Sequence, residues 1–319
     1  MSEPVPGGNG QDTEGRSYQS TRGLDYGSVP WRLWEKSKKL FWDPADIDFT
    51  QDAADWQAMP EEERTLVAMS ARGFMVGEEA VTLDIVPLLR CMSDLGRLED
   101  TMYLSMFAME EAKHTELFRR WFDAVGLDPA SLDDLVRARQ AALGDRRGIF
   151  DGPLTRVMRR LDTDRSPQAI LDASIIYNQF VEGVLAIAGY QRWEQTFRTL
   201  GKLPGLEAGL KLTQRDERRH IAYGTYLARR LLAQNPELWE WLEQRWAKLT
   251  AGLGAGPGGY GAGDSRGAQQ REAAELAELY QRLSRRRLEA LAVARTMTAR
   301  EVDTSAVEAF EPEELQHVN

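Results

Sequence analysis

Two of the three histidines in this chain stand in matching sequence frames. Glu111 comes three residues before His114, and Glu217 comes three residues before His220. On a helix, side chains three apart are neighbours on one face, with Cβ atoms about 5–6 Å apart, so a carboxylate and an imidazole can reach one metal ion. A single frame of this kind is usually exposed to solvent, but two frames in one chain predict metal ligands.

Each frame has another glutamate upstream, in an otherwise apolar segment. Glu78 precedes Glu111 by 33 positions, and Glu182 precedes Glu217 by 35. An unpaired carboxylate buried beside Phe180 and Val184 would be costly unless a cation or a proton neutralised it. Helix periodicity does not decide between neighbouring glutamates at 78 and 79, or at 110 and 111. The predicted ligands are Glu78, Glu111, His114, Glu182, Glu217 and His220.

The chemistry of this donor set limits the metals. Four carboxylates balance the charge of two divalent ions, and two neutral imidazoles add nitrogen donors. An oxygen-rich set favours iron and manganese over copper or structural zinc. If both metals became trivalent, two positive charges would remain, so the oxidised site should recruit oxide, hydroxide or an exogenous carboxylate. A buried, redox-capable dinuclear site is suited to activating dioxygen.

Four long segments with helical periodicity must position these ligands. Pro87 is expected to kink the first, Ser93 to cap the second, and Gly126 and Gly201 to close the second and third. The segments are residues 61–92, 93–125, 166–200 and 204–234. Shorter helical pieces are predicted at 130–143, 152–161, 237–249 and 268–300. This pattern predicts an all-α, ferritin-like four-helix bundle with additional helices and with ligands on facing helices.

The domain organisation follows from composition. We expect one ferritin-like metal-binding helical domain with appendages, because Gly and Pro gather at the chain start and near residue 260. The expected parts are a flexible N-terminal tail (1–23), the metal-binding domain (24–250), a Gly-rich flexible insert (251–267), a C-terminal helix (268–300) and an acidic C-terminal tail (301–319).

Charge and cysteine content exclude several classes. The net charge of -10 disfavours nucleic acid as a partner. The single cysteine, Cys91, cannot form an intrachain disulfide, and the first 23 residues contain no apolar signal core, so we expect a cytoplasmic protein. The most apolar stretch, residues 170–190, is interrupted by polar residues including Glu182, so we expect no membrane span.

Residues 23–232 resemble the ribonucleotide reductase small-subunit superfamily. The Phe-Trp-Asp-Pro element at 41–44 adds to the likeness, and it implies that Trp42 is linked through Asp216 to His114. Two departures distinguish the chain from standard subunits. Phe118 occupies the position of the radical-forming tyrosine, and Glu78 stands where standard subunits use aspartate.

These departures, the motif at 77–84 and Tyr177 ahead of Glu182 resemble the small-subunit-like ligand-binding oxidases. That resemblance implies a heterodinuclear manganese and iron centre that reacts with dioxygen, with a long-chain fatty acid bridging the metals. It also implies an ether cross-link between Val81 and Tyr177. Manganese would be held by Glu78, Glu111 and His114, and iron by Glu182, Glu217 and His220. A di-iron pair is also compatible with these donors.

The spacing of the cross-link residues tests the resemblance. Val81 is three residues after Glu78 and can lie on the same helix face, which favours Glu78 over Glu79 as the ligand. Tyr177 is five residues before Glu182, and a regular helix would turn these side chains well apart. We therefore expect a π-bulge or another local distortion in this helix.

The function expected is a dioxygen-dependent oxidase with a fatty-acid-like ligand, an unidentified electron donor and a homodimeric assembly. The alternative is a reductase small subunit of the manganese and iron type without a tyrosyl radical, which the Trp42 to Asp216 link supports. Such subunits dock their large partner through a flexible tail that bears a tyrosine, and here the last tyrosine is Tyr280. Iron storage fits poorly, because a cage is built from shorter chains.

Overall fold

The computed structural model describes residues 19–143, 148–150, 152–251, 253 and 266–316. Within this part of the chain every regular element is helical and no strand occurs, as predicted. Most of the predicted N-terminal tail (1–23) and of the Gly-rich insert (251–267) lies outside the described residues, as do the last three residues of the acidic tail.

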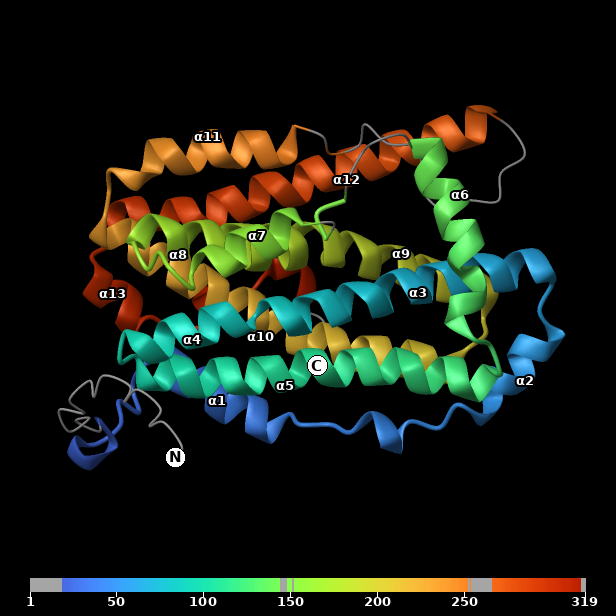
Figure 1. Ribbon diagram of the computed structural model, residues 1–319, viewed down its shortest axis with the longest axis horizontal. Helices are drawn as coiled ribbons and strands as arrows, with labels where there is room; N and C mark the ends of the chain where they lie inside the picture. The colour runs from blue at the N-terminus through green and yellow to red at the C-terminus, as the bar shows by residue number, and fades with distance from the viewer. Residues whose placement is uncertain (1–18, 144–147, 151, 252, 254–265, 317–319) are drawn as a thin grey trace, which may run out of the picture.

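Four long helical rods lie side by side and form the predicted bundle (Figure 1). The first is α3 (Glu61–Asp84), continued by α4 (Val86–Asp94), and the second is α5 (Leu98–Val125). The third combines α8 (Pro167–Ser174), the π-helix η4 (Ile175–Ala186) and α9 (Ile187–Leu200). The fourth is α10 (Pro204–Gln234).

The ends of these rods follow the predicted signals with one exception. Gly126 and Gly201 close their helices with φ of 71° and 60°, left-handed values that suit glycine. The first rod breaks at Ile85, so that Pro87 lies in the first turn of α4. The prediction that Ser93 caps the second helix was wrong, because the apolar face formed by Leu88, Cys91 and Met92 carries α4 on to Asp94.

Further helices cover the bundle. Before it come α1 (Val29–Lys39) and α2 (Thr50–Ala58), and between its second and third rods lie α6 (Asp133–Leu143) and α7 (Pro153–Arg160). After it come α11 (Leu238–Thr250), α12 (Arg266–Ala292) and α13 (Ala299–Thr304). In the acidic C-terminal segment, Phe310 and Leu315 are buried, and Glu311 pairs with Lys36 and Arg218. This segment therefore packs onto the bundle.

The third and fourth rods approach each other closely at Gly224. A Cβ atom at this position would lie 2.1 Å from Cβ of Asn178, so only glycine fits there. The Ser174 hydroxyl donates to the Gly224 carbonyl at 2.9 Å. This close approach holds the π-helix against α10, the two elements that carry Glu182 and Glu217.

The third rod is the one helix in the described part of the chain that is long and apolar enough to cross a membrane. Its most apolar 18-residue window is 89% buried inside the protein, as expected for the core helix of a bundle. Length and composition are therefore weak evidence for a span.

Candidate metal centre

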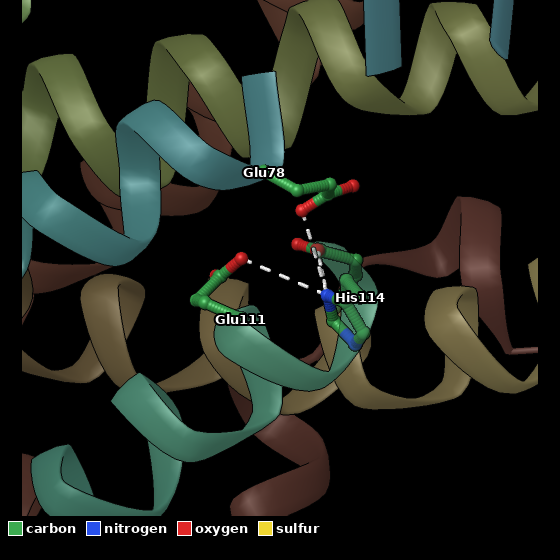
Figure 2. A group of neighbouring side chains, drawn as sticks. Glu78, Glu111 and His114 are labelled. Atoms are coloured by element: carbon green, nitrogen blue, oxygen red, sulfur yellow. Dashed lines mark ion pairs between the residues drawn. The ribbon is translucent and has the colours of Figure 1, made fainter. Parts of the chain in front are cut away.

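Six side chains converge in the middle of the bundle. They form two overlapping groups, each with ligand atoms within 4.8 Å of one another, and every member is buried. The first group is Glu78, Glu111, His114 and Glu217, and the second is Glu111, Glu182, Glu217 and His220. Figure 2 shows the Glu78 and Glu111 carboxylates turned toward His114. The structure thus brings together all six residues that the sequence predicted as ligands.

Four different helical rods supply these residues. Helix α3 and the π-helix η4 each contribute one glutamate, Glu78 and Glu182. Helices α5 and α10 each contribute a glutamate and a histidine three residues apart. Glu79 is exposed, so Glu78 is the residue of that pair that reaches the centre. This is the ligand arrangement of ferritin-like dinuclear carboxylate proteins.

Both imidazoles turn Nδ1 toward the carboxylates. His114 Nδ1 lies 3.5 Å from Glu78 and 3.6 Å from Glu111. His220 Nδ1 lies 3.1 Å from Glu111. The other nitrogen of each ring contacts a carboxylate outside the ligand groups, so a proton on Nε2 leaves the Nδ1 lone pair free for a metal ion.

These outer carboxylates come from the opposite frame in each case. Asp216 lies 3.2 Å from His114 Nε2, and Glu110 lies 2.9 Å from His220 Nε2. The role of Glu110 was not predicted. The signal was present in the sequence, because Glu110 precedes Glu111 as Asp216 precedes Glu217.

Burial makes it unfavourable for all the ligand carboxylates to be ionised at once. Burial raises the pKa of Glu78 to about 8 and that of Glu182 well above its ordinary value. Burial also opposes ionisation of Glu111, but the His114 and His220 rings, which lie against its carboxylate, hold its pKa at about 2. A set of buried carboxylates that resists full ionisation without positive charge is typical of a metal site.

Buried ligand atoms without hydrogen-bond partners also indicate a metal site. Several buried ligand atoms have no hydrogen-bond partner among the described residues, although such atoms are nearly always paired. They are both carboxylate oxygens of Glu111, Nδ1 of His114 and of His220, and one oxygen each of Glu182 and Glu217. Two divalent metal ions would satisfy these atoms, so the residues fit the dinuclear centre that the sequence predicted.

A buried polar network surrounds the ligands. Asp216 accepts a hydrogen bond from Trp42 Nε1 at 2.7 Å and forms an ion pair with Lys113 at 2.8 Å. Arg219 contacts both outer carboxylates, with a bond of 2.6 Å to Glu110 and a further bond to Asp216. Burial opposes ionisation of Asp216, but its bond from His114 and the charge of Arg219 hold its pKa well below the usual range. The link from Trp42 through Asp216 to His114 is therefore present as a hydrogen-bonded chain.

Val81 and Tyr177 are both buried and lie together. The Tyr177 hydroxyl donates to the Val81 carbonyl at 3.0 Å. The distortion expected between Tyr177 and Glu182 is confirmed, because η4 is a π-helix in which the Ile187 amide bonds to the Glu182 carbonyl five residues back. This widened helix lets Tyr177 and Glu182 reach the same region. Phe118 is fully buried and has no hydroxyl.

Comparisons with known proteins agree with this geometry. Residues 28–251 match the family model "Ribonucleotide reductase, small chain". The chain is 36% identical to an R2-like ligand-binding oxidase from Sulfolobus acidocaldarius, over 90% of this chain and 98% of that chain, with a TM-score of 0.77. It is 30% identical to an R2-like ligand-binding oxidase variant with an aerobically reconstituted Mn/Fe cofactor, over 88% and 98% of the two chains, with a TM-score of 0.71.

The family match covers more than half of the chain, and the structural neighbours are aligned over nearly their whole length. The chain therefore belongs to the ribonucleotide reductase small-chain family and, within it, to the R2-like ligand-binding oxidases.

Proposed function

We propose that this oxidoreductase is a dioxygen-dependent Mn/Fe oxidase that binds a fatty-acid-like carboxylate and joins Val81 to Tyr177 through an ether bond. The observation that carries the proposal is the Tyr177 hydroxyl, held at the Val81 backbone beside six converging ligands. A metal store would need the ligands alone. A buried phenol placed against a valine is what an intramolecular oxidation requires.

The ligand residues would divide between two ions. Glu78, Glu111 and His114 would hold manganese, and Glu182, Glu217 and His220 would hold iron. Reduction of dioxygen to water takes four electrons. When bound, the two metal ions would supply two of them, one from each ion. A Mn/Fe cofactor in the solved relatives supports this pair, and a di-iron pair is the alternative that the same donors accept.

The ether bond accounts for the other two electrons. One C–H bond at Val81 Cβ and the O–H bond of Tyr177 break, one C–O bond forms, and two protons and two electrons leave for dioxygen. Burial raises the pKa of Tyr177 well above 10, so the phenol keeps its proton until it is oxidised. The bond to the Val81 carbonyl holds the phenol oxygen beside the residue whose Cβ it would join.

The surroundings of the site suit an aliphatic ligand. Val81, Ile85 and Val184 belong to one apolar cluster that also includes Phe180. A carboxylate head would add the negative charge that an oxidised centre lacks, while its tail would lie among these side chains. The unidentified electron donor, the homodimeric assembly and the cytoplasmic location remain part of the proposal.

The second candidate function is a reductase small subunit without a tyrosyl radical. The hydrogen-bonded chain of Trp42, Asp216 and His114 favours it, because this chain connects the centre to a nearly buried indole. The contact between Val81 and Tyr177 has no role in such a subunit, so the ligand-binding oxidase is the better-supported function.

A peptide map tests the proposal. Reduced protein loaded with manganese and iron is exposed to air, and proteolysis should yield the Val81 and Tyr177 peptides joined at their summed mass less two hydrogens. Val81→Ala and Tyr177→Phe should each abolish the joined product while keeping both metals, since neither residue is a proposed ligand. Recovery of separate, unmodified peptides from fully oxidised, correctly metallated protein would favour the reductase function instead.

A further inference from the structure

Lys113 occupies an unusual position for a lysine. Its side chain is only 4% exposed, although it lies on the same helix as Glu111 and His114. Its ammonium lies 4.4 Å from the centroid of the Trp42 ring and 2.8 Å from Oδ2 of Asp216. It also lies 5.2 Å from the ring of Phe41. The lysine thus places a charge directly over the indole that is linked to the metal ligand His114.

Trp42 is well placed to lose an electron to an oxidised centre. Its indole stacks nearly parallel to the His114 ring, with centroids 6.2 Å apart and planes at 16°. Its N–H donates to Asp216, which contacts His114 in turn. An indole is among the most easily oxidised side chains, and Asp216 lies where the N–H proton would go. Oxidation of Trp42 would divert oxidising equivalents from Val81 and Tyr177.

The His220 side offers a poorer route. Phe107 stacks on His220 with centroids 3.7 Å apart, and Tyr103 follows at 6.1 Å from Phe107. The Tyr103 hydroxyl is fully buried and has no hydrogen-bond partner among the described residues. A phenol that loses an electron must also lose its proton, and Tyr103 has no acceptor. Trp42 is therefore the residue whose oxidation needs to be controlled.

The charge of Lys113 acts on this oxidation in two ways. An ammonium over an aromatic face is attracted by the electron-rich ring of the neutral indole. The same ammonium repels the indole radical cation that forms when an electron leaves. The same charge lies 2.8 Å from Asp216 Oδ2, the oxygen that accepts the indole N–H, and lowers the affinity of this oxygen for the indole proton. Both effects disfavour loss of an electron from Trp42.

We propose that Lys113 is a positioning residue that protects Trp42 from oxidation and so keeps the oxidising power of the centre on Val81 and Tyr177. This inference rests on the proposed function, because it assumes a centre that oxidises nearby side chains. It also distinguishes this chain from a subunit that passes oxidising equivalents outward through its tryptophan. Trp42 is structurally linked to the centre but is made difficult to oxidise.

The test compares wild type with Lys113→Met, which removes the charge at similar length, and with Lys113→Arg, which keeps it. Each protein is loaded with manganese and iron and exposed to air, and one peptide map measures both the Val81–Tyr177 link and oxidation of Trp42. The product sought is N-formylkynurenine, which is the indole plus one dioxygen molecule. Because a desolvated charge close to a ring has a large effect, Trp42 oxidation should rise about tenfold in Lys113→Met. It should stay at the wild-type level in Lys113→Arg.

Trp121 provides an internal reference. Its indole also donates to a buried aspartate, Asp52, at 3.1 Å, but its ring packs on Trp56 and Phe122. Oxidation of Trp121 should be equal in all three proteins. A general loosening of the fold by Lys113→Met would raise oxidation of both tryptophans, and Lys113→Gln then serves as the second charge-free variant. A rise at both tryptophans in both charge-free variants would contradict the inference.

A second arm needs no bound metal. Metal-free proteins are illuminated with a ruthenium tris-bipyridine complex and persulfate, which together supply a one-electron oxidant, and the same peptides are measured. If the link forms in metal-loaded wild type and Trp42 oxidation in air is equal in metal-loaded Lys113→Met, the inference is overturned while the proposed function stands. If no link forms in metal-loaded wild type, the proposed function fails. Higher oxidation of Trp42 under light in Lys113→Met than in Lys113→Arg then still supports protection by Lys113, and equal oxidation overturns it.

Discussion

The two histidine sides of the centre share one geometry but differ in what lies behind it. Each imidazole turns Nδ1 to the ligand group and Nε2 to a carboxylate from the opposite helix. On the His114 side that carboxylate, Asp216, continues to Trp42. On the His220 side, Glu110 accepts a hydrogen bond from Arg219, whose guanidinium is not readily oxidised.

The comparison shows that the repeated frame fixes the ligands but does not fix the reactivity. Both frames place a glutamate and a histidine on one helix face, and both supply an acid just before that glutamate. The residues behind those acids differ, because Asp216 contacts Trp42 from the segment after α1, whereas Glu110 contacts Arg219 from within the second frame. Differences between the two metal positions are therefore expected to arise outside the ligands themselves.

Removing a ligand that the two sides share should give the largest effect. Glu111 belongs to both ligand groups, so Glu111→Ala should reduce metal content from two ions per chain to nearly none. His220 belongs to one group only, and His220→Ala should retain about one ion, as should Glu182→Ala. Elemental analysis after desalting measures this. Retention of two ions in all three variants would rule out the ligand assignment.

Removing the outer carboxylates should give smaller and unequal effects. Loss of a carboxylate behind a ligand histidine typically weakens metal binding about 10–100-fold. Asp216→Asn should be the more severe change, because it also leaves Lys113 and Arg219 short of a buried negative partner. Glu110→Gln keeps Asp216 beside Arg219. Chelator competition at fixed pH gives the affinities, and the prediction fails if Glu110→Gln is the weaker binder.

The change in stability of the metal-free protein with pH should be smaller still. The pKa of Glu78 is raised by burial to about 8, so the folded protein binds more protons than the unfolded chain between about pH 4.5 and 8. Stability from this group is present at low pH and is lost as pH rises through 8. The midpoint temperature of thermal unfolding of chelator-treated protein should therefore fall by several degrees from pH 5 to pH 8. Metal-loaded protein should not show this fall, because the ions replace the protons.

The smallest effect is expected at the neighbour of a ligand. Glu79 is exposed, and Glu79→Ala should keep both metals and change stability by no more than about 0.5 kcal/mol. Glu78→Ala in parallel should lose metal from the His114 side. Elemental analysis and thermal unfolding of the pair test the register directly. Loss of metal on changing Glu79 would show that the helix presents the other glutamate.

Much of the fold could be predicted because the signals are local. The glycines at 126 and 201 mark helix ends through their own backbone preferences, and Ser166 marks the start of α8 because its side chain accepts a hydrogen bond from the Ala169 amide. Ser93 misled because it directly follows the buried pair Cys91 and Met92 and is itself part of α4, which ends at Asp94 before Gly96 takes a left-handed conformation. The ligands could be predicted because each metal frame combines a glutamate with a histidine, and these two residue types are rare together on apolar helix faces.

The rest of the site depends on contacts between distant segments. Lys113 looks like an ordinary solvent-facing residue in the sequence, but distant residues, Phe41, Trp42 and Asp216, surround its ammonium. Helix periodicity left Glu78 and Glu79 undecided, the resemblance at Val81 favoured Glu78, and the packing of α3 buries Glu78 and leaves Glu79 exposed. The function of Glu110 depends on its distance from His220, 110 residues later in the chain. Local patterns cannot contain this information.

The π-helix η4 has a consequence for insertions and deletions in this protein. A regular helix with four residues from Tyr177 to the next ligand would be one residue shorter than the present segment, so a correct alignment with such a helix needs a one-residue gap. Deleting one residue between Asn178 and Val181 would let the segment revert to a regular α-helix. Everything after the deletion would rotate relative to Tyr177 and Asn178, so the damage would reach Glu182 although no ligand had been substituted. A single lost codon at this point would be more harmful than most changes of residue type around it.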